Sequence, residues 1–284
     1  MNPTEEFERN RVHLRSVAYR MLGSISEADD AVQEAWLRFD RSDRAEVENM
    51  RAWLTVVVSR VCLDMLRSRR ARREDLFDGS LPEPIVTFEE SGDPEREVLM
   101  ADSVGLALQV VLETLSPAER LAFVLHDMFG MAFEEIAPIV DRSVPATRQL
   151  ASRGRRRVRG VEPPEPPSDA QQRAVIDAFL AASREGDFDA LLQVLDPDVV
   201  MRIDAGRRPQ TSELHGARDV AEMVLAQGSP RARFGRHAIV NGAPGVAVVR
   251  HGRVLAVAAF TTAAGRITSL DLVADPDKLR HVPA

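Results

Sequence analysis

Two helical patterns between residues 26 and 73 constrain the fold of this chain more than any other feature. Ser26, followed three residues later by Asp29, is typical of a helix N-terminus. The apolar positions that then recur at helical spacing are Val32, Ala35, Trp36 and Phe39 in the first pattern, and Leu54, Val58, Val61, Cys62 and Met65 in a second that begins near Arg51. We therefore expect two packed helices, each with a polar outer face.

The outer faces of these two helices carry opposite charge. The first presents a mainly acidic ridge made of Asp30, Gln33, Glu34 and Leu37. The second presents Arg60, Asp64 and Arg67, and the stretch from Arg51 to Arg73 holds seven Arg and one acid. A local charge of this size is typical of binding to a phosphate backbone. An ordinary helical pair with a solvated charged face is the alternative.

The segments DDAVQEAWLRF and NMRAWLTVVVSRVCLDMLRSRR resemble, in this order, region 2 of bacterial extracytoplasmic-function (ECF) sigma factors. The resemblance implies that Asp30, Gln33, Glu34 and Leu37 bind the clamp of core RNA polymerase. It also implies that the second helix melts and reads the −10 promoter element, where an unstacked base is held in a pocket. The implied −10 residues are Asn49, Met50, Arg51, Arg60, Asp64 and Arg67.

Composition excludes several classes of protein. No apolar run approaches twenty residues, and the polar start MNPTEEFERN is not a signal peptide, so we expect a cytoplasmic protein without a membrane span. The single cysteine, Cys62, excludes an intrachain disulfide and a cysteine-rich metal site, and we expect no metal or cofactor. The net charge of −7 hides two basic blocks, because the acids concentrate in the linkers and the C-terminal third.

A first helical domain is predicted for residues 1–73, beginning with a helix from Thr4 to Leu22. Residues 74–98 form an acidic interdomain linker, with nine acids against one Arg between Glu74 and Glu97. Its segment Ser80 to Val86, SLPEPIV, is apolar enough to dock on a folded surface. The family resemblance implies that this linker threads the polymerase cleft toward the RNA exit path, whereas an acidic solubilising tether is the alternative.

A second helical domain is predicted for residues 99–160. Its first helix carries an apolar stripe, Val104, Leu108, Val111, Leu112 and Leu115, and Ser116-Pro117 begins the next helix. FEEIAPIV, the turn from Asp141 to Ser143 and a helix from Val144 to Arg159 have helix-turn-helix spacing. On the last helix the inward positions are Val144, Thr147, Ala151 and Val158.

The outward positions of that last helix suit DNA binding. They are Arg148, Gln149, Ser152, Arg153, Arg155 and Arg156. Arg can bind guanine and Gln can bind adenine, each through two hydrogen bonds, whereas Arg156, Arg157 and Arg159 near the helix end suit phosphate contacts. The segment LSPAERLAFVLHDMFGMAFEEIA, followed by ATRQLASRGRRRV, resembles sigma region 4, which binds the −35 element. Asp141 and Arg142 in the turn and Pro138 within the supporting helix depart from the family pattern.

A proline-rich linker, 161–169, precedes a third domain at 170–284. The predicted elements are a helix Ala170–Arg184 with a buried stripe of Val175, Ala178, Phe179 and Ala182, a helix Phe188–Leu195, a strand Val199–Ile203, a helix from His215 or Gly216, and strands Arg236–Asn241, Val246–Arg250, Val254–Thr262 and Ile267–Val273. Helices followed by a strand meander indicate an α+β cone. This domain resembles the SnoaL-like, NTF2-type fold. The fold class is therefore multidomain: two all-α sigma domains, a region 2 helical bundle and a region 4 helix-turn-helix, followed by the cone.

Enzymes occur among proteins with this cone fold, and a carboxylate or His serves them as general base. Asp204, His215 and Asp271 are the candidates here. None has a second catalytic partner at convincing spacing, so we expect no catalytic residue and no enzyme activity.

Together the three domains resemble the SnoaL-tailed sigma factors of the SigJ type. This resemblance implies an alternative sigma factor, with core RNA polymerase and promoter DNA as partners, whose tail contacts and regulates the sigma domains in cis without a separate anti-sigma protein. The implied tail elements are a docking linker at Leu81–Pro84, the segment Asp204–Arg208, and Asp275, Pro276, Asp277, Lys278 and Leu279. The alternative is a helix-turn-helix DNA-binding regulator fused to a small-molecule-binding or isomerase/cyclase-like NTF2 domain.

Overall fold

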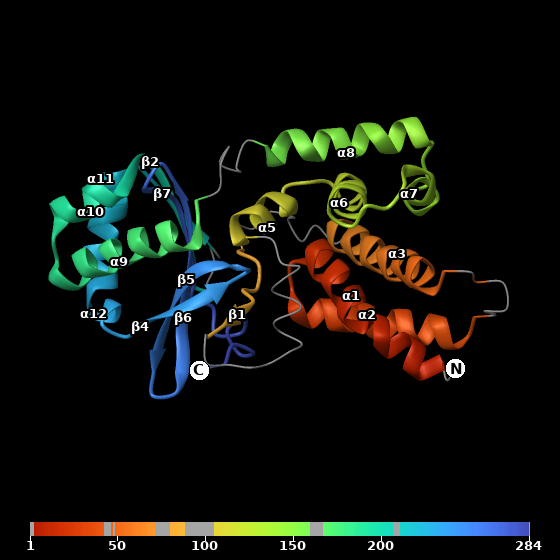
Figure 1. The fold of residues 1–284 in the computed structure, drawn as a ribbon, viewed down its shortest axis with the longest axis horizontal. Coiled ribbons are helices and arrows are strands. Elements are labelled where there is room, and N and C mark those ends of the chain that lie inside the picture. Colours follow the sequence, from red (N-terminus) through yellow and green to blue (C-terminus); the bar gives the residue numbers. More distant parts are fainter. Residues whose placement is uncertain are drawn as a thin grey trace. The chain divides into compact units, whose positions relative to one another are not determined.

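The computed structural model describes residues 3–42, 47, 49–71, 80–88, 105–159, 167–206 and 211–283. The chain divides into two compact units (Figure 1). The first contains residues 1–77 and 108–161, and the second contains residues 78–107 and 162–284. Within the described residues, no helix is both long enough and apolar enough to cross a membrane.

The first unit is built from helices. They are α1 (Pro3–Leu22), α2 (Ile25–Asp40), α3 (Met50–Ala71), α5 (Leu106–Glu113, which begins at the boundary between the units), α6 (Pro117–Phe123), the π-helix η1 (Val124–Met128), α7 (Phe133–Val140) and α8 (Val144–Val158).

The predicted inward faces of α2 and α3 form one core with α1. Phe39, Leu54 and Cys62 are fully buried, and the Phe7 ring lies 5.0 Å from the Trp36 ring. The predicted start of α2 at Ser26 is wrong. The cap is Ser24, whose hydroxyl accepts a hydrogen bond from the Glu27 amide. Gly23 ends α1 with a φ of 72°, so the next helix begins at once.

The second half of this unit contains the predicted helix-turn-helix, α7 and α8. Asp141 takes the left-handed conformation that ends α7, with a φ of 55°, and the Ser143 side chain caps α8. On α5 the predicted stripe is partly wrong, because Gln109 is fully buried whereas Leu108 and Val111 are half-buried. The Gln109 amide donates to two backbone carbonyls of α1, which is why a polar residue lies inside.

The second unit is an α+β domain around a seven-stranded sheet of order β1-β4-β5-β6-β7-β2-β3. Its elements are β1 (Val86–Thr87), α9 (Asp169–Glu185), α10 (Phe188–Val194), β2 (Leu195–Asp204), β3 (Thr211–His215), α11 (Ala217–Met223), the π-helix η2 (Val224–Gly228), α12 (Ser229–Ala232), β4 (Gly235–Val240), β5 (Ala243–Arg250), β6 (Arg253–Ala263) and β7 (Arg266–Val273). Only the β2–β7 pair is parallel among these described strands.

Glycine turns organise the predicted meander. Gly242, Gly252 and Gly265 have positive φ, and so does the residue before each of them. Two consecutive left-handed residues make the tight hairpin turn whose twist matches that of the flanking strands. The predicted meander of strands is confirmed.

The helices α9 to α12 lie on one side of the sheet (Figure 1), and their apolar faces form the core with it. The predicted buried stripe of α9 is partly wrong. Ile176 and Leu180 are buried, whereas Ala178 is exposed, because the helix face is turned toward the larger side chains. Strand β3 was not predicted. It pairs with β2 and ends at His215, so the next helix begins after it, with Gly216 at its N-cap.

The linker contributes the first strand of this sheet. Val86 pairs with Val240 and Thr87 pairs with Ile239, so β1 extends the sheet edge from a segment far away in the sequence. Ile85 and Asn241 also exchange two hydrogen bonds, of 2.8 and 3.0 Å. The expectation that the apolar segment Ser80–Val86 docks on a folded surface is therefore confirmed, and its binding site lies on the C-terminal domain.

Candidate nucleic-acid interface and linker site

The acidic ridge of α2 faces solvent. Asp30 and Gln33 are exposed, Glu34 is half-exposed and pairs with Arg38 at 2.9 Å, and the Leu37 side chain is 42 % exposed. An exposed leucine between acidic groups is a contact point suited to another protein. The sequence predicted this ridge because helical spacing separates it from the buried face.

The outer face of α3 is basic and open. Arg60, Asp64 and Arg67 are exposed, and none of the three has an ion-pair partner among the residues that the structure describes. Two other predicted residues have local structural roles. The Asn49 side-chain oxygen accepts a hydrogen bond from the Ala52 amide at 3.1 Å and so caps α3. The Arg51 guanidinium lies 3.0 Å from His13 Nδ1, and Met50 is half-buried.

The predicted reading face of α8 is exposed, with differing restraints on its side chains. Gln149, Ser152 and Arg156 are exposed. Arg148 lies 3.3 Å from Glu134, and Arg155 lies 2.6 Å from Asp127 and is only half-exposed. Thr147, Ala151 and Val158 are buried as predicted, and Val144 is half-buried.

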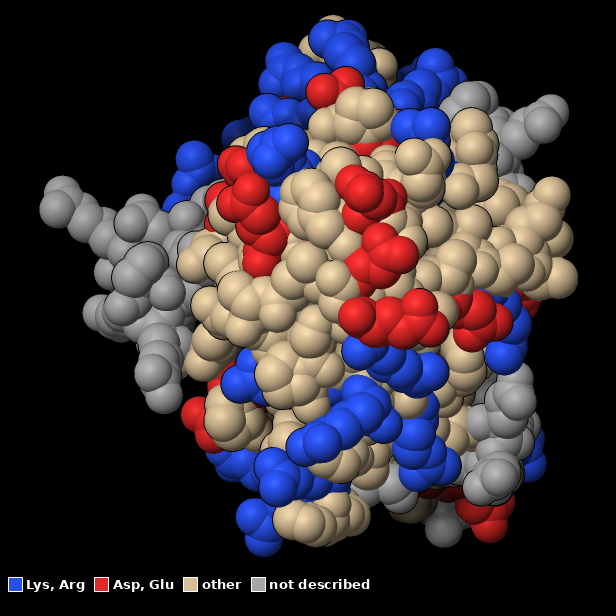
Figure 2. Space-filling view, turned by 90° about the vertical axis from the view of Figure 1, so that its left-hand side faces the viewer, with Lys and Arg blue, Asp and Glu red and all other residues tan. Residues whose placement is uncertain are grey.

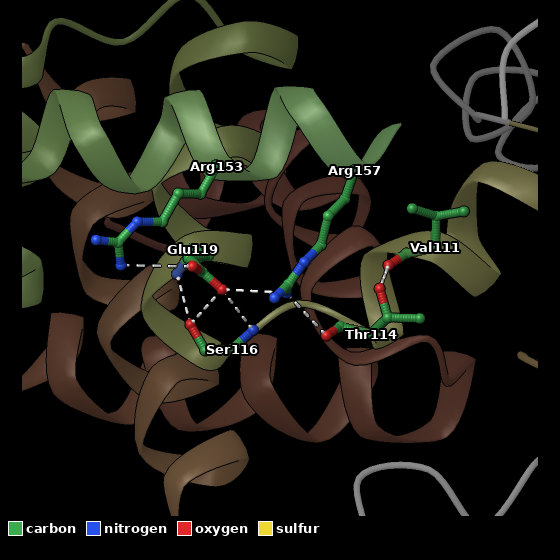
Figure 3. Close-up of polar contacts among 6 residues, drawn as sticks. All are labelled: Val111, Thr114, Ser116, Glu119, Arg153 and Arg157. Carbon is green, nitrogen blue, oxygen red and sulfur yellow. Dashed lines mark hydrogen bonds and ion pairs between the residues drawn. The ribbon is translucent and has the colours of Figure 1, made fainter. Parts of the chain in front are cut away.

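Glu119 pairs with two exposed arginines of α8, Arg153 and Arg157 (Figure 3). Arg157 lies 3.3 Å from this carboxylate and also donates to the Thr114 carbonyl, while Arg153 lies 3.9 Å away. The carboxylate is nearly buried, and Ser116 completes its capping box. A buried charge needs such partners, so Arg157 pairs with Glu119 inside its own domain, although the Arg157 side chain remains 51 % exposed. Its expected phosphate contact stays a prediction.

The helix-turn-helix half of the first unit packs against the N-terminal helices. Arg120 is buried, and its guanidinium donates to the Met21 carbonyl at 2.8 Å. Burial lowers the pKa of Arg120 to about 10, so it remains charged at neutral pH. Phe129 lies under the Arg20 guanidinium and edge-on to His13. The sequence did not predict this contact, because Arg120 lies in an ordinary amphipathic helix.

In the second unit, four residues meet where the linker docks: Ser80, Leu81, Asp204 and Lys278. We call this group the linker clamp. Asp204 is fully buried, and its carboxylate accepts hydrogen bonds from the Leu81 amide at 2.9 Å and from Ser80. The Lys278 ammonium lies 2.6 Å from Asp204 and also donates to the Ser80 hydroxyl and the Leu81 carbonyl.

The rest of the predicted tail segments surround the clamp. Gly206 donates its amide to Asp204, and a Cβ on Gly206 would lie 2.7 Å from the Asp275 carboxylate. Leu279 is buried, and Asp277 lies exposed in the same turn. The predicted positions Arg207 and Arg208 lie outside the described residues.

Comparison with known proteins identifies the family. Residues 7–72 match the family Sigma-70 region 2, and residues 105–158 match Sigma-70 region 4. The chain is 39 % identical to the ECF RNA polymerase sigma factor SigJ of Mycobacterium tuberculosis, over 98 % of this chain and 93 % of SigJ. The chain belongs to the ECF RNA polymerase sigma factors.

Further relatives agree with this assignment. The probable ECF sigma factor SigI of the same species is 36 % identical over 95 % of this sigma factor and 92 % of SigI. The crystal structure of SigJ superimposes with a TM-score of 0.77 at 35 % identity and covers 98 % of both chains. As a sigma factor, the chain binds core RNA polymerase and promoter DNA, and it is not an enzyme. Its C-terminal domain has the NTF2-like fold that the sequence predicted.

The C-terminal domain of this sigma factor contains a cavity of about 470 Å³. Its lining includes Met201 and Ile203 of β2 and Leu270 and Leu272 of β7. Successive side chains of a strand point to opposite faces of the sheet. Asp204 and Asp271 therefore point to the opposite face of the sheet, and His215 is exposed beside Glu213. Burial raises the pKa of Asp271 to about 6, although Arg202 lies 3.1 Å away. None of the three catalytic candidates lines the cavity.

Proposed function

We propose that three surfaces of the first unit divide the work of this sigma factor. The polymerase-binding surface is Asp30, Gln33, Glu34 and Leu37; the −10 surface is Asn49, Met50, Arg51, Arg60, Asp64 and Arg67; the −35 surface is Arg148, Gln149, Ser152, Arg153, Arg155 and Arg156. The observation that carries this proposal is the exposure of two basic helix faces, on α3 and α8, in a chain that belongs to a promoter-binding family.

The α2 ridge is the surface that docks on the polymerase clamp. Leu37 supplies an exposed apolar centre, and the acidic groups around it supply charge complementarity to a basic partner. This combination favours a protein partner over DNA, because carboxylates repel phosphates.

The α3 face handles the −10 element. Arg60 and Arg67 have no acidic partner among the described residues and so are free to contact phosphates. Asn49 uses its oxygen to cap the helix, which leaves its NH₂ group as donor to an unstacked base.

The α8 face reads the −35 element, with unequal contributions from its residues. Gln149 and Arg156 are exposed and available at once. Arg148 can leave its ion pair with Glu134 and bind DNA at little cost, because an exposed ion pair contributes only about 0 to 1 kcal/mol to stability. Arg155 is held at 2.6 Å by Asp127, so its contribution is smaller.

The first unit must open to bind a promoter. The two promoter elements are centred about 25 base pairs apart, which corresponds to roughly 85 Å at about 3.4 Å per base pair. A compact unit of about 130 residues has a radius of gyration of about 14 Å. The contacts of Gln109 and Arg120 with α1 therefore belong to a closed state that cannot contact both elements.

The C-terminal domain regulates this opening in cis. By holding Ser80 and Leu81 in the linker clamp, it withholds from the polymerase the linker that joins the two DNA-binding domains. This arrangement makes a separate anti-sigma protein unnecessary. The protein acts in the cytoplasm, where polymerase and promoter are found, and without membrane attachment.

The first prediction concerns the polymerase surface. We expect the double change Asp30→Arg and Glu34→Arg to abolish co-purification with core polymerase and promoter-dependent transcription, because it reverses the charge of the ridge. Binding is measured by pull-down with purified core enzyme, and transcription by run-off from a promoter selected with the wild-type protein. The matched control is Glu8→Arg, which reverses an exposed acid on α1.

Two outcomes would contradict the assignment. If the double variant binds core polymerase as tightly as the control does, the ridge is not the docking surface. If the wild-type protein binds DNA but never makes core polymerase promoter-selective, the chain acts as a plain DNA-binding regulator.

A further inference from the structure

The three surfaces proposed for polymerase and promoter binding do not include the cavity of the C-terminal domain. It lies between the sheet and the helices α9, α11 and η2, and its volume of about 470 Å³ is in the range of small-molecule sites, about 300 to 1,000 Å³. Its inner wall is apolar, with Phe179 from α9 and Met201, Phe260 and Leu270 from three strands. The buried part of a ligand must therefore be apolar as well.

The cavity opens into a basic groove. This second hollow of about 480 Å³ shares Gln227, Arg231, Val248 and Leu255 with the cavity, and Phe234 and two further arginines line it, Arg233 and Arg250. The two hollows thus meet at one mouth, with apolar walls inside and arginines outside. Figure 2 shows basic side chains gathered on this face of the domain, toward the end that carries α12 and β4, below a band of acidic ones.

The three arginines of the groove have no carboxylate partner among the described residues. Arg231 donates to the Gln227 carbonyl at 2.9 Å. Arg233 and Arg250 stack on the Phe234 ring at 4.8 and 5.3 Å, which fixes both cations beside the mouth. Guanidinium groups without an acidic partner are ready to bind a carboxylate or a phosphate through paired hydrogen bonds.

Two irregularities of the backbone shape the same mouth. Val248 pairs with Ala256 but Val249 pairs with Val254, so Leu255 is the extra residue of a β-bulge, and its side chain is 43 % exposed. Across the mouth, the helix changes to the π-helix η2, which carries Gln227. Bulges and π-helices sacrifice regular hydrogen bonding and occur preferentially at functional sites.

We propose that this cavity binds a single-chain amphiphile with an anionic head group. The tail lies against Phe179, Met201 and Phe260, the first part of the chain passes Leu255, and the head contacts Arg231, Arg233 and Arg250. A fully polar ligand would leave the apolar wall without partners, and a neutral apolar ligand would leave the arginines unused. The volume suits one acyl chain of medium length, not the two chains of a phospholipid.

Isothermal titration of the full-length protein tests this proposal. The probes are dodecanoate, dodecyl phosphate and octanoate, each below its critical micelle concentration, and 1-dodecanol below its solubility limit. We expect one of the two anionic C12 probes to bind with 1:1 stoichiometry, and the tighter one identifies the head group. Dodecanol should bind at least tenfold more weakly, and affinity should fall about fourfold for each CH₂ group removed from the tail.

Variants assign the binding to this site. Arg231→Ala combined with Arg250→Ala should weaken binding of the anionic probe at least tenfold without changing the affinity for dodecanol. Leu255→Ser should weaken both probes, and it leaves the core intact because Leu255 is exposed. The matched control is Arg266→Ala, an exposed arginine outside both hollows.

Three results would overturn the proposal: failure of both anionic probes to bind the wild type, dodecanol binding as tightly as they do, or full affinity of the double arginine variant. Circular dichroism of each variant shows that the fold is retained.

Discussion

At the scale of single residues, Lys278 decides the linker clamp. It is the only lysine among 37 basic residues, and it contacts three oxygens that converge on one point. An ammonium group is compact and donates three hydrogen bonds in different directions, whereas a guanidinium is a planar fork. The chemistry of the site therefore requires lysine where the rest of the chain uses arginine.

We expect Lys278→Arg to loosen the linker nearly as much as Lys278→Met does. Hydrogen bonds to a charged group contribute about 2 kcal/mol, so the Leu81 amide should exchange with solvent about 30-fold faster. Hydrogen–deuterium exchange measures this, and run-off transcription should change in level while the start site is kept. Arg280→Lys, in the same exposed turn, is the control. Unchanged exchange at Leu81 in both Lys278 variants would contradict the role of the clamp.

At the scale of elements, the helix-turn-helix tolerates two unfavourable residues. Pro138 interrupts the hydrogen bonding of α7, and Asp141 adopts a left-handed conformation. The helix still forms because it is only eight residues long and because Ile136, Ile139 and Val140 are buried on its inner face. Packing therefore outweighs local preference at this turn.

We expect Asp141→Gly to raise the stability of this element by about 1 kcal/mol, because glycine adopts a positive φ without a steric penalty. Asp141→Ala should lower it, since alanine lacks even the partial tolerance of aspartate. The measurement is exchange of the Thr147 amide, which closes the first turn of α8 on the Ser143 carbonyl. Slower exchange in the alanine variant than in the glycine variant would refute this account of the turn.

At the scale of the whole molecule, the proposed function requires the first unit to change from a closed to an open state. Gln109 and Arg120 hold α5 and α6 against α1 through buried hydrogen bonds to backbone carbonyls. Such bonds are specific but can be exchanged for bonds to solvent, unlike a large apolar interface. The closed state is thus well defined and still able to open.

We expect Arg120→Met together with Gln109→Ala to favour the open state, because both changes remove the donors to α1, and Arg120→Met also keeps the apolar stem of the side chain. Spin labels at Glu8→Cys and Ser152→Cys report the separation of α1 and α8, since burial raises the pKa of the native Cys62 thiol and keeps it unreactive. The mean distance should increase, as it should when core polymerase binds the wild type. Arg156→Ala is the control, and an unchanged distance in the double variant would contradict the proposed closed state.

Local patterns in the sequence determined most of the helices and strands and which of their faces are buried. Helical spacing predicted the buried and exposed faces of α2, α3 and α8, and the strand pattern predicted the meander, because these periodicities act within a few residues. The same patterns also predicted which residues of the proposed polymerase and DNA surfaces are exposed. Their roles stay predictions.

Only the tertiary structure decided which distant residues meet. Asp204 looked like a candidate base in the sequence, and its place in the linker clamp depends on Ser80 and Lys278, which lie far from it along the chain. Strand β1 is too short to recognise, and it exists because β4 offers a free edge. Gln109 and Arg120 are buried because α5 and α6 pack against α1, which is another contact between segments that are distant in the sequence. Contacts between distant segments depend on how whole surfaces fit together, and the spacing of apolar residues within one segment does not predict that fit.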